Sequence, residues 1–414
     1  MKYNIIAIGD ELLIGQVTDT NSGWIARHLT PYGWKLQGVQ VVPDDAAEIK
    51  RAIDIAFSQS DVALMTGGLG PTKDDITKPA LCEYFGGEML YDDEVARQVE
   101  WVVNQRHLKL NDYTRAQAMV PSSCNVIQNE VGTAPLMWFE RDGKVLVSMP
   151  GVPFETETMM QRKVIPMLLH HYDNDVAIEH RTMVVVGIIE SLLAMKLDTF
   201  ERELPSYIHL AYLPQGGYIK LRLTGMAIDA NALGHEMKVQ ACRLHDILGD
   251  AIVCDDDKPL SAIVGDMLRS KGMTLATAES CTGGNIAHEI TSIAGSSDYF
   301  IGGVVSYATR VKTDVLNVSQ ADVDKFTVVS EEVARQMAKG VSRRLNTDCA
   351  IATTGIAGPS GGDENNPVGT VWMAVHVNGK TQTMKKHYPG TRERVIIRAT
   401  TDSLLMLLDE LRHI

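Results

Sequence analysis

Short apolar runs alternate with amphipathic stretches in the first third of the chain. Residues 4–8, 36–42 and 61–66 are typical of buried strands, whereas 21–30 and 46–59 carry their apolar residues at helical spacing. Strands that alternate with helices of this length predict a parallel sheet in an α/β layer fold. Ligands of such sheets bind beyond the carboxyl ends of the strands, so the polar and glycine-rich turns there are of most interest.

The pattern changes between residues 171 and 257. Residues 183–187 and 218–224 are predicted strands and 230–248 a predicted helix, with few glycine-rich polar turns between them. We therefore predict a small α+β connecting domain. Three consecutive aspartates and a proline within 255–259 do not continue a packed element and indicate a hinge.

The α/β alternation resumes after the hinge. Helices are predicted at 260–270, 331–345 and 392–411, and strands at 273–278, 301–307, 349–354, 368–377 and 380–388. The last two strands flank Asn378-Gly379, a strong signal for a two-residue hairpin turn. The sequence thus predicts two α/β domains with mainly parallel sheets, 1–170 and 258–414, joined by a small α+β domain, 171–257.

Composition narrows the class of protein. The chain has 414 residues, 45% of them hydrophobic and 22% charged, which is ordinary for a soluble globular enzyme. Its net charge of -13 opposes non-specific binding to nucleic acid or to an anionic membrane, so we expect neither as a partner. The six cysteines are scattered without a CxxC pair, which favours reduced thiols over a zinc site.

Targeting signals are not apparent in the chain. The apolar run at residues 4–8 is too short for a signal peptide, and acidic residues follow it at once. No stretch approaches the roughly 18 apolar residues of a membrane helix. A cytoplasmic location is expected.

Ser280 stands where a predicted strand gives way to a helix, and two glycines follow shortly after it. The first turn of a helix offers unpaired backbone N–H groups that can stabilise an oxyanion, and glycines allow close approach of a ligand. Either Ser280 is a nucleophile at this turn, or Ser280 or Thr282 simply caps the helix. Cys281 competes as a nucleophile, but without a histidine beside it we interpret it as a packing residue.

A serine nucleophile needs a base, and no histidine of the last domain suits that role. His288 points away on the helix, and the others lie in the hairpin or at the terminus: His376, His387 and His413. Lys312, which follows a strand together with Tyr307, is the alternative base if burial or Arg310 lowers its pKa.

A glycine-rich segment at 353–362 follows another predicted strand. Such a loop can wrap a phosphate with its backbone N–H groups. It lacks the Gly-Lys-Ser/Thr ending of an ATP-binding loop, which disfavours hydrolysis of nucleoside triphosphates.

Four motifs of the last domain together resemble a known family. They are Ala278-Glu279-Ser280-Cys281-Thr282-Gly283-Gly284, Tyr307 with Lys312, Thr354-Gly355-Ile356-Ala357-Gly358-Pro359, and Gly390-Thr391-Arg392-Glu393-Arg394. They closely resemble the nicotinamide mononucleotide (NMN) deamidase family, the C-terminal domains of the competence/damage-inducible protein A (CinA) proteins. The resemblance implies a cofactor-independent amidohydrolase of pyridine nucleotide salvage, which converts NMN to nicotinate mononucleotide and ammonia.

The resemblance also implies roles for individual residues. Ser280 would be the nucleophile and Lys312 its base, with Tyr307 in support. Arg394 would bind the substrate's phosphate, since a guanidinium offers paired donors in one plane. The implied substrate-binding residues are Thr282, Gly283, Gly284, Thr354, Gly355, Gly358 and Arg394.

Motifs of the first domain resemble the molybdopterin-binding-like domain of the same family. They lie at 9–16, 18–21, 67–75 and 149–155. Some members are metal-dependent ADP-ribose pyrophosphatases, which implies ADP-ribose as a second substrate and a divalent ion (Mg, Mn or Co). The carboxylates that suit such an ion are Asp10, Asp74, Asp75 and Glu155. The alternative for Asp74 and Asp75 is to cap the predicted helix at 76–85.

Three positions depart from the family pattern and leave the chemistry of the first domain open. The chain has Ala116 where the family has a lysine, Leu136 where it has a glycine, and Ile189 where it again has a glycine. The resemblance implies a homodimer. A non-catalytic interaction protein in competence or repair is the remaining alternative, although the acidic balance and the lack of a basic stripe argue against direct contact with DNA.

Overall fold

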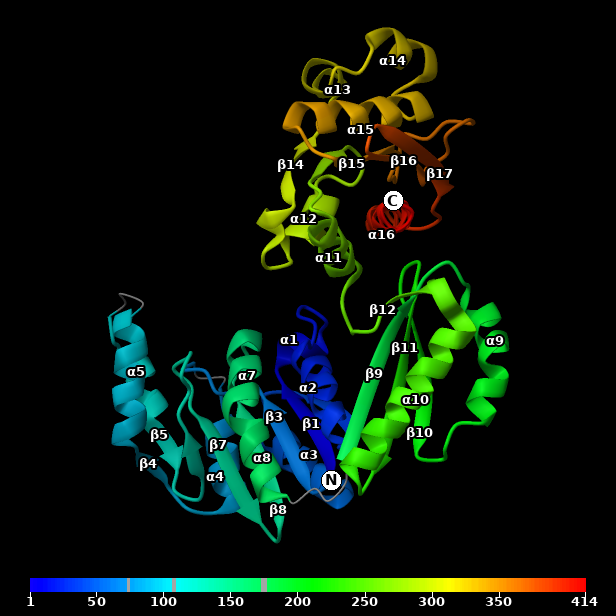
Figure 1. The fold of residues 1–414 in the computed structure, drawn as a ribbon. Coiled ribbons are helices and arrows are strands. Elements are labelled where there is room, and N and C mark those ends of the chain that lie inside the picture. The colour runs from blue at the N-terminus through cyan, green and yellow to red at the C-terminus, as the bar shows by residue number, and fades with distance from the viewer. Residues whose placement is uncertain (73–74, 106–108, 173–176) are drawn as a thin grey trace. The chain divides into compact units, whose positions relative to one another are not determined.

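The computed structural model describes residues 1–72, 75–105, 109–172 and 177–414 (Figure 1). Its residues form two compact units, Met1–Glu179 with Met226–Gly234, and His180–Gly225 with His235–Ile414. Most of the connecting segment therefore falls in the second unit. The domain boundaries at 170/171 and 257/258 stay predictions.

The first unit is built around a six-stranded sheet of order β2-β1-β3-β8-β7-β6. Its strands are β1 (Lys2–Ile8), β2 (Lys35–Val42), β3 (Val62–Thr66), β6 (Asn125–Ile127), β7 (Leu136–Arg141) and β8 (Lys144–Met149). The first four in this order pair in parallel, and β7 and β6 extend the sheet antiparallel. All five residues of β3 are buried, as expected for a central strand covered on both faces.

Alternate residues of β1 divide the core of this unit into two layers. Tyr3 and Ile5 pack with α2 (Asn21–Leu29), α7 (Pro153–Met159) and α8 (Ile165–His171). Ile6 and Ile8 pack on the opposite face with α3 (Ala46–Gln59) and α4 (Thr77–Phe85). This alternation follows from the two-residue period of a strand.

Smaller elements complete the first unit. They are α1 (Asp10–Leu13), the 3₁₀ turns Thr30–Tyr32 and Ala116–Ala118, α5 (Asp93–Gln105), α6 (Asp112–Arg115), the π-helical turn Met160–Val164, and the two-stranded sheet of β4 (Met89–Tyr91) and β5 (Met119–Pro121).

The connecting segment contains a four-stranded sheet of order β10-β11-β9-β12. Its elements are β9 (Ala177–Val185), α9 (Glu190–Arg202), β10 (Ile208–Pro214), β11 (Ile219–Ala227), α10 (Ala230–Leu248), the 3₁₀ turn Gly249–Ala251 and β12 (Ile252–Cys254). The sequence pattern predicts β9, β11 and α10 but misses α9, β10 and β12. Most of β10 is only partly buried, so the contrast between its polar and apolar positions is weak.

The last sheet has the order β14-β13-β15-β16-β17. Its strands are β13 (Leu275–Glu279), β14 (Phe300–Val305), β15 (Cys349–Gly355), β16 (Thr370–Val377) and β17 (Lys380–His387). The first three in the sheet order are parallel and the last two antiparallel. The predicted α/β class is confirmed, with parallel strands at the centre of both large sheets.

Two layers of helices cover this sheet (Figure 1). Helices α11 (Leu260–Lys271), α12 (Asn285–Thr291) and α16 (Arg392–Arg412) lie on one face. Helices α13 (Thr309–Leu316), α14 (Gln320–Phe326) and α15 (Glu331–Leu345) lie on the other, and a short 3₁₀ turn spans Ser296–Asp298. None of the helices in the described part of the chain is long and apolar enough to cross a membrane.

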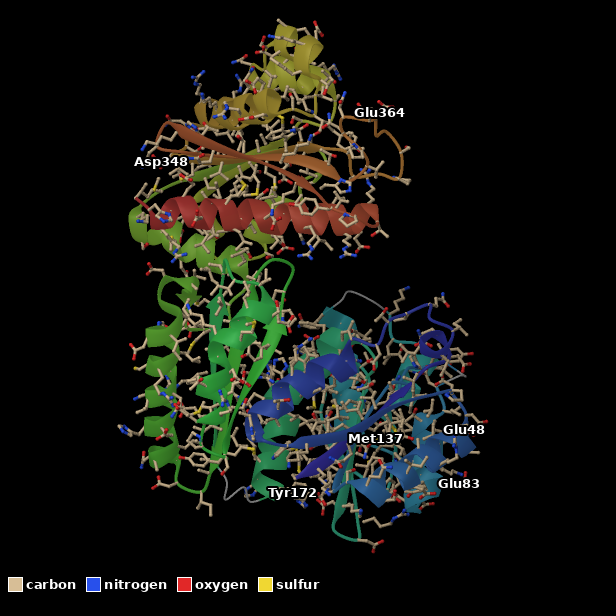
Figure 2. All side chains as sticks on the ribbon, turned by 90° about the vertical axis from the view of Figure 1, so that its right-hand side faces the viewer. Glu48, Glu83, Met137, Tyr172, Asp348 and Glu364 are labelled. Atoms are coloured by element: carbon tan, nitrogen blue, oxygen red, sulfur yellow. The ribbon has the colours of Figure 1, made fainter. Side chains whose placement is uncertain are left out.

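Two local contacts fix the strand register in this sheet. Asn378 (φ 46°) and Gly379 (φ 85°) form the predicted two-residue turn between β16 and β17. At the same end of the sheet, Asp348, labelled in Figure 2, accepts hydrogen bonds from the backbone N–H (2.8 Å) and hydroxyl (2.7 Å) of Thr274. These bonds hold the starts of β13 and β15 together.

Gly340 on α15 provides a test of the packing in this layer. A Cβ atom at Gly340 would lie 2.1 Å from the backbone carbonyl oxygen of Leu316. Because that oxygen belongs to the chain and not to a flexible side chain, we expect Gly340→Ala to lower the free energy of unfolding by about 2 kcal/mol. Gly23→Ala on α2 is the control: nothing lies within 4 Å of its Cβ position, and a gain of up to about 1 kcal/mol is expected. Urea unfolding of both variants checks the difference, and equal stabilities would contradict this packing.

Candidate functional site

Ser280 lies in the turn between β13 and α12, as the sequence pattern predicts. Its backbone N–H donates to the carbonyl oxygen of Thr353 at 3.0 Å, which ties the turn to the end of β15. Gly283 and Gly284 both have positive φ angles (64° and 102°), so the chain reverses sharply after Ser280 before α12 begins. The Ser280 side chain is 9% exposed and lines a cavity.

Lys312 is in direct contact with Ser280. Its Nζ atom lies 3.0 Å from Ser280 Oγ and donates a second hydrogen bond to the Ser306 carbonyl oxygen at 2.5 Å. The lysine sits on helix α13 and is 2% exposed. Burial lowers its pKa from the usual 10.5 and thereby favours the neutral amine.

Other candidate nucleophiles and bases fit this site less well. Burial raises the pKa of the Cys281 thiol to about 12, so it stays protonated near neutrality. His288 is exposed on α12, and the Nδ1 atom of His376 lies 2.7 Å from the hydroxyl of Thr381, its partner across the hairpin. Their placement agrees with the expectation that no histidine serves Ser280.

The cavity beside Ser280 and Lys312 has a volume of about 370 Å³. It brings together six of the predicted site residues: Ser280, Tyr307, Lys312, Thr354, Gly355 and Gly358. The other four are not among its lining residues: Thr282, Gly283, Gly284 and Arg394. Thr354 lines the wall while its hydroxyl donates to the Val328 carbonyl oxygen at 2.6 Å, which fixes the adjacent loop.

Arg392, and not Arg394, lines the cavity. Its guanidinium donates to the Gly358 carbonyl oxygen at 2.8 Å and to the Tyr307 hydroxyl at 2.9 Å. Arg392 is the first residue of α16, so two positions further along the helix the side chain of Arg394 points to a different side. The sequence motif contains both arginines, and only helical phase distinguishes them.

The side chain of Thr282 forms hydrogen bonds within the protein instead of lining the cavity. Its hydroxyl donates to the carboxylate of Glu279 at 2.7 Å and lies 2.7 Å from the hydroxyl of Thr353. Glu279 is a further residue of this turn to which the sequence assigns no role.

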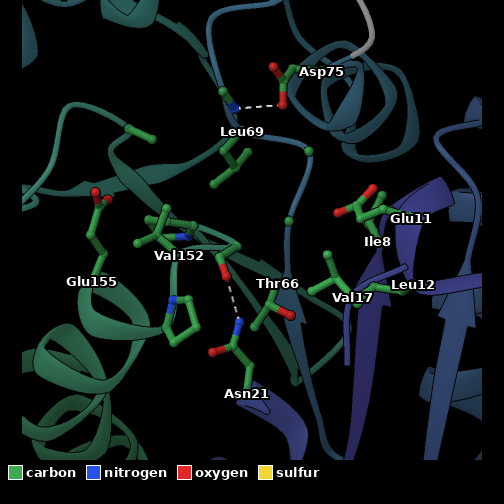
Figure 3. A pocket seen from close by; sticks show the side chains of 18 of the residues that line it. Ile8, Glu11, Leu12, Val17, Asn21, Thr66, Leu69, Asp75, Val152 and Glu155 are labelled. Carbon is green, nitrogen blue, oxygen red and sulfur yellow. Dashed lines mark hydrogen bonds between the residues drawn. The ribbon is translucent and has the colours of Figure 1, made fainter. Parts of the chain in front are cut away.

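A second cavity, of about 460 Å³, lies in the first unit at the carboxyl ends of β1 and β3 (Figure 3). The Gly67–Gly70 turn and the segment Thr18–Asn21 line it, as expected from their motifs. Of the four predicted metal ligands, Asp75 and Glu155 line this cavity and Asp10 does not. Asp74 lies outside the described residues.

The two predicted metal ligands that line this second cavity have protein partners. Asp75 accepts from the backbone N–H groups of Gly70 (2.7 Å, Figure 3) and Thr72 (2.9 Å), and so shapes the glycine-rich turn. Glu155 accepts from the side-chain amide of Asn129 at 2.9 Å. Among the described residues no three acidic, histidine or cysteine side chains are grouped to hold a metal. The metal site stays a prediction.

The sequence analysis missed two residues here: Asp44, which lines the second cavity, and Lys78, which contacts the lining residue Gln117. Burial raises the pKa of the Asp44 carboxyl group. Lys78, buried below, donates to the backbone (2.7 Å) and side-chain (3.0 Å) carbonyl oxygens of Gln117, while Gln117 donates to the Leu69 carbonyl oxygen at 2.9 Å. The family pattern has a lysine at position 116, and here Lys78 contacts the next residue, Gln117, from another part of the chain. Burial lowers the pKa of Lys78 to about 8.

The other two departures from the family pattern have different surroundings. Leu136 is fully buried at the start of β7 and packs in the core layer next to α2. Ile189 is exposed just before α9. Neither residue lines the second cavity.

Comparison with known proteins places both sites in a family. Residues 257–411 match the CinA C-terminal domain, and residues 4–170 match the probable molybdopterin binding domain. A CinA-like protein of Flavobacterium psychrophilum is 43% identical over 413 residues, which cover 99% of each chain. One of Cytophaga hutchinsonii is 40% identical over 98% of this chain and 96% of its own.

Solved structures of CinA superfamily proteins match a little over a third of the chain, for example 36% and 37% of it. The crystal structure of a CinA superfamily protein from Escherichia coli has 36% sequence identity and a TM-score of 0.36, and covers 36% of this chain and 88% of its own. From the full-length sequence relatives and the two matched domains, the chain belongs to the CinA family.

Proposed function

We propose that the last domain hydrolyses the carboxamide of nicotinamide mononucleotide, yielding nicotinate mononucleotide and ammonia. The observation that carries this proposal is the 3.0 Å contact between Lys312 Nζ and Ser280 Oγ at a cavity. Because burial lowers the pKa of Lys312, the neutral amine needed to activate a serine hydroxyl is accessible. The family resemblance supplies the substrate.

In the acylation step, Ser280 Oγ attacks the carboxamide carbon while its proton passes to Lys312 Nζ. The Ser306 carbonyl oxygen accepts one N–H of the lysine and keeps the amine aimed at Ser280. When the tetrahedral intermediate collapses, the C–N bond breaks and the lysine returns the proton to the departing nitrogen. Ammonia leaves and a nicotinoyl ester remains on Ser280.

Deacylation reverses these roles. Lys312 takes a proton from water, the resulting oxygen nucleophile attacks the ester carbon, and Ser280 recovers its proton as nicotinate mononucleotide leaves. The backbone N–H groups of Cys281 and Thr282 directly follow the nucleophile in the turn before α12. They are suited to stabilise the oxyanion.

Arg392 is the proposed partner of the substrate's phosphate, in place of Arg394. Arg392→Gln is expected to raise KM for NMN by about 30-fold with little change in kcat, since a guanidinium–phosphate contact contributes similarly before and during the reaction. Arg394→Gln is the matched control, from the same turn of α16, and should leave both constants near the wild-type values. Steady-state kinetics of the two variants check this, and a larger KM effect at Arg394 would restore the sequence-based assignment.

The direct test of the proposal is ammonia release from NMN by the purified full chain in the presence of EDTA. Stoichiometric ammonia and nicotinate mononucleotide are expected without any added metal. Absence of turnover with NMN, while another primary carboxamide is hydrolysed, would keep the chemistry and reject the substrate.

A second activity is proposed for the cavity of the first unit. Its glycine-rich turn suits a phosphate-bearing nucleotide, and the family resemblance supplies both ADP-ribose and the divalent ion. Assays with ADP-ribose and Mg, Mn or Co test this, and lack of AMP and ribose 5-phosphate with every metal would reject it.

A homodimer is also proposed, and the molar mass in solution decides it. If neither substrate is turned over, a non-catalytic role becomes the better interpretation.

A further inference from the structure

Glu279, the last residue of β13, is a buried carboxylate with an unusual set of partners. It is 1% exposed, and no basic side chain in the described ranges forms an ion pair with it. Its Oε2 atom accepts three hydrogen bonds, from the Thr282 hydroxyl (2.7 Å) and the backbone N–H groups of Gly284 (3.0 Å) and Ile286 (3.0 Å). Its Oε1 atom accepts from the Ala287 N–H at 2.9 Å.

These bonds join the end of a strand to the start of a helix across the nucleophile. Ser280 lies between Glu279 and the residues whose N–H groups the carboxylate holds. The Glu279 backbone is fixed as well, because its carbonyl oxygen accepts from the Ser306 N–H at 2.7 Å. The Ser306 carbonyl oxygen in turn accepts a hydrogen bond from Lys312. Ser306 therefore links Glu279 to the proposed base.

The carboxylate also changes what the turn offers to a substrate. A strand–glycine turn–helix unit commonly presents its free N–H groups to an external anion. Here Glu279 takes up three N–H groups at the start of α12 and supplies the negative charge from within the protein. The substrate's phosphate must therefore be bound elsewhere, which agrees with the position of Arg392 at the cavity.

We propose that Glu279 is the positioning residue for Ser280. Its carboxylate holds the turn so that Ser280 Oγ lies within hydrogen-bonding distance of Lys312 Nζ, without contacting substrate itself. The inference rests on the proposed serine–lysine chemistry, not on the identity of the substrate. Glutamine has the same shape but would direct an NH₂ group at N–H donors, so the neutral side chain cannot make the four bonds that the carboxylate accepts.

The test compares Glu279→Gln with wild type in two measurements. For NMN hydrolysis, kcat should fall by about 100-fold while KM stays within about 3-fold, the pattern of a misplaced nucleophile. For labelling of Ser280 by a fluorophosphonate probe, the rate constant should fall by a similar factor, while the endpoint stays at one label per chain. Thr277→Val, a buried change in the same strand away from the α12 amides, is the control and should keep the wild-type labelling rate.

The endpoint separates a positioning role from a purely structural one. If Glu279→Gln only unfolds part of the population, the endpoint falls and the surviving fraction is labelled at the wild-type rate, which would overturn the inference.

Thr282→Val removes one donor and keeps the carboxylate, so it should slow labelling by about 5-fold. If Glu279→Gln does not fold, the labelling rate of Thr282→Val tests the positioning role in its place. Labelling of wild-type Ser280 without NMN turnover would reject the proposed substrate and leave the Glu279 comparison intact. No labelling of wild-type Ser280 would reject both.

Discussion

Ser280→Ala is expected to reduce NMN hydrolysis by about 10⁴-fold, the largest effect of any single substitution. Without the hydroxyl no acyl-enzyme can form, and only substrate binding and oxyanion stabilisation remain to accelerate the attack of water. KM should change little, because Ser280 contributes few contacts to the bound phosphate. Ammonia release over long incubations, corrected for the uncatalysed rate, measures the residual activity.

Ser292→Ala is the control for that substitution. Ser292 lies just beyond the other end of α12 and is exposed, and its hydroxyl donates to the carbonyl oxygen of Glu289 at 2.8 Å. It should keep full activity. A Ser280→Ala variant that retains more than about a tenth of wild-type kcat would show that another group, or water directly, attacks the carboxamide.

Lys312→Met is expected to reduce kcat by about 10³-fold. Methionine fills a similar volume in the buried site but cannot accept the proton of Ser280, so the general-base contribution is lost. Lys325→Met is the control, because Lys325 is an exposed lysine on the neighbouring helix α14. Thermal unfolding should show a loss of stability of at most about 2 kcal/mol, because the lysine's two hydrogen bonds are lost together with the cost of burying its amine.

The pH dependence of the rate tests the same residue. The pKa of Lys312 lies below 10.5, so the fraction of neutral amine increases as pH rises. The wild-type kcat/KM should therefore climb with pH with a midpoint below pH 10.5, and the climbing limb should be absent in Lys312→Met. An unchanged limb in the variant would mean that a different group is the base.

Elements with strong local signals could be predicted from the sequence within a residue or two. Helices α3 and α15 combine a clear apolar face with a polar cap at the first turn. Asp45 accepts from the N–H groups of Ala47 and Glu48, and Ser330 accepts from that of Val333. The position of Ser280 at a strand-to-helix turn follows from the same kind of local signal.

Residues whose role depends on tertiary contacts could not be placed in this way. The burial of Lys312 is visible only in its contacts with Ser280 and Ser306, which lie 32 and 6 positions away in the sequence. Glu279 looks like one of many strand-end carboxylates until the α12 amides are seen to converge on it. The choice of Arg392 over Arg394 depends on where α16 begins.

The first unit shows the same limit. Asp75 has the chemistry of a metal ligand in sequence, but in the structure its carboxylate accepts hydrogen bonds that shape the glycine-rich turn. The link from Lys78 to Gln117 joins residues 39 positions apart, a distance at which sequence periodicity carries no information.

The serine–lysine route is tested most directly by the competition between water and hydroxylamine for the acyl-enzyme formed from NMN. A nicotinoyl ester on Ser280 should be intercepted, so the hydroxamate of the mononucleotide should form in proportion to hydroxylamine while the rate of ammonia release does not fall. Ser280→Ala should form none. Turnover that yields only nicotinate mononucleotide at every hydroxylamine concentration would contradict a covalent intermediate on Ser280.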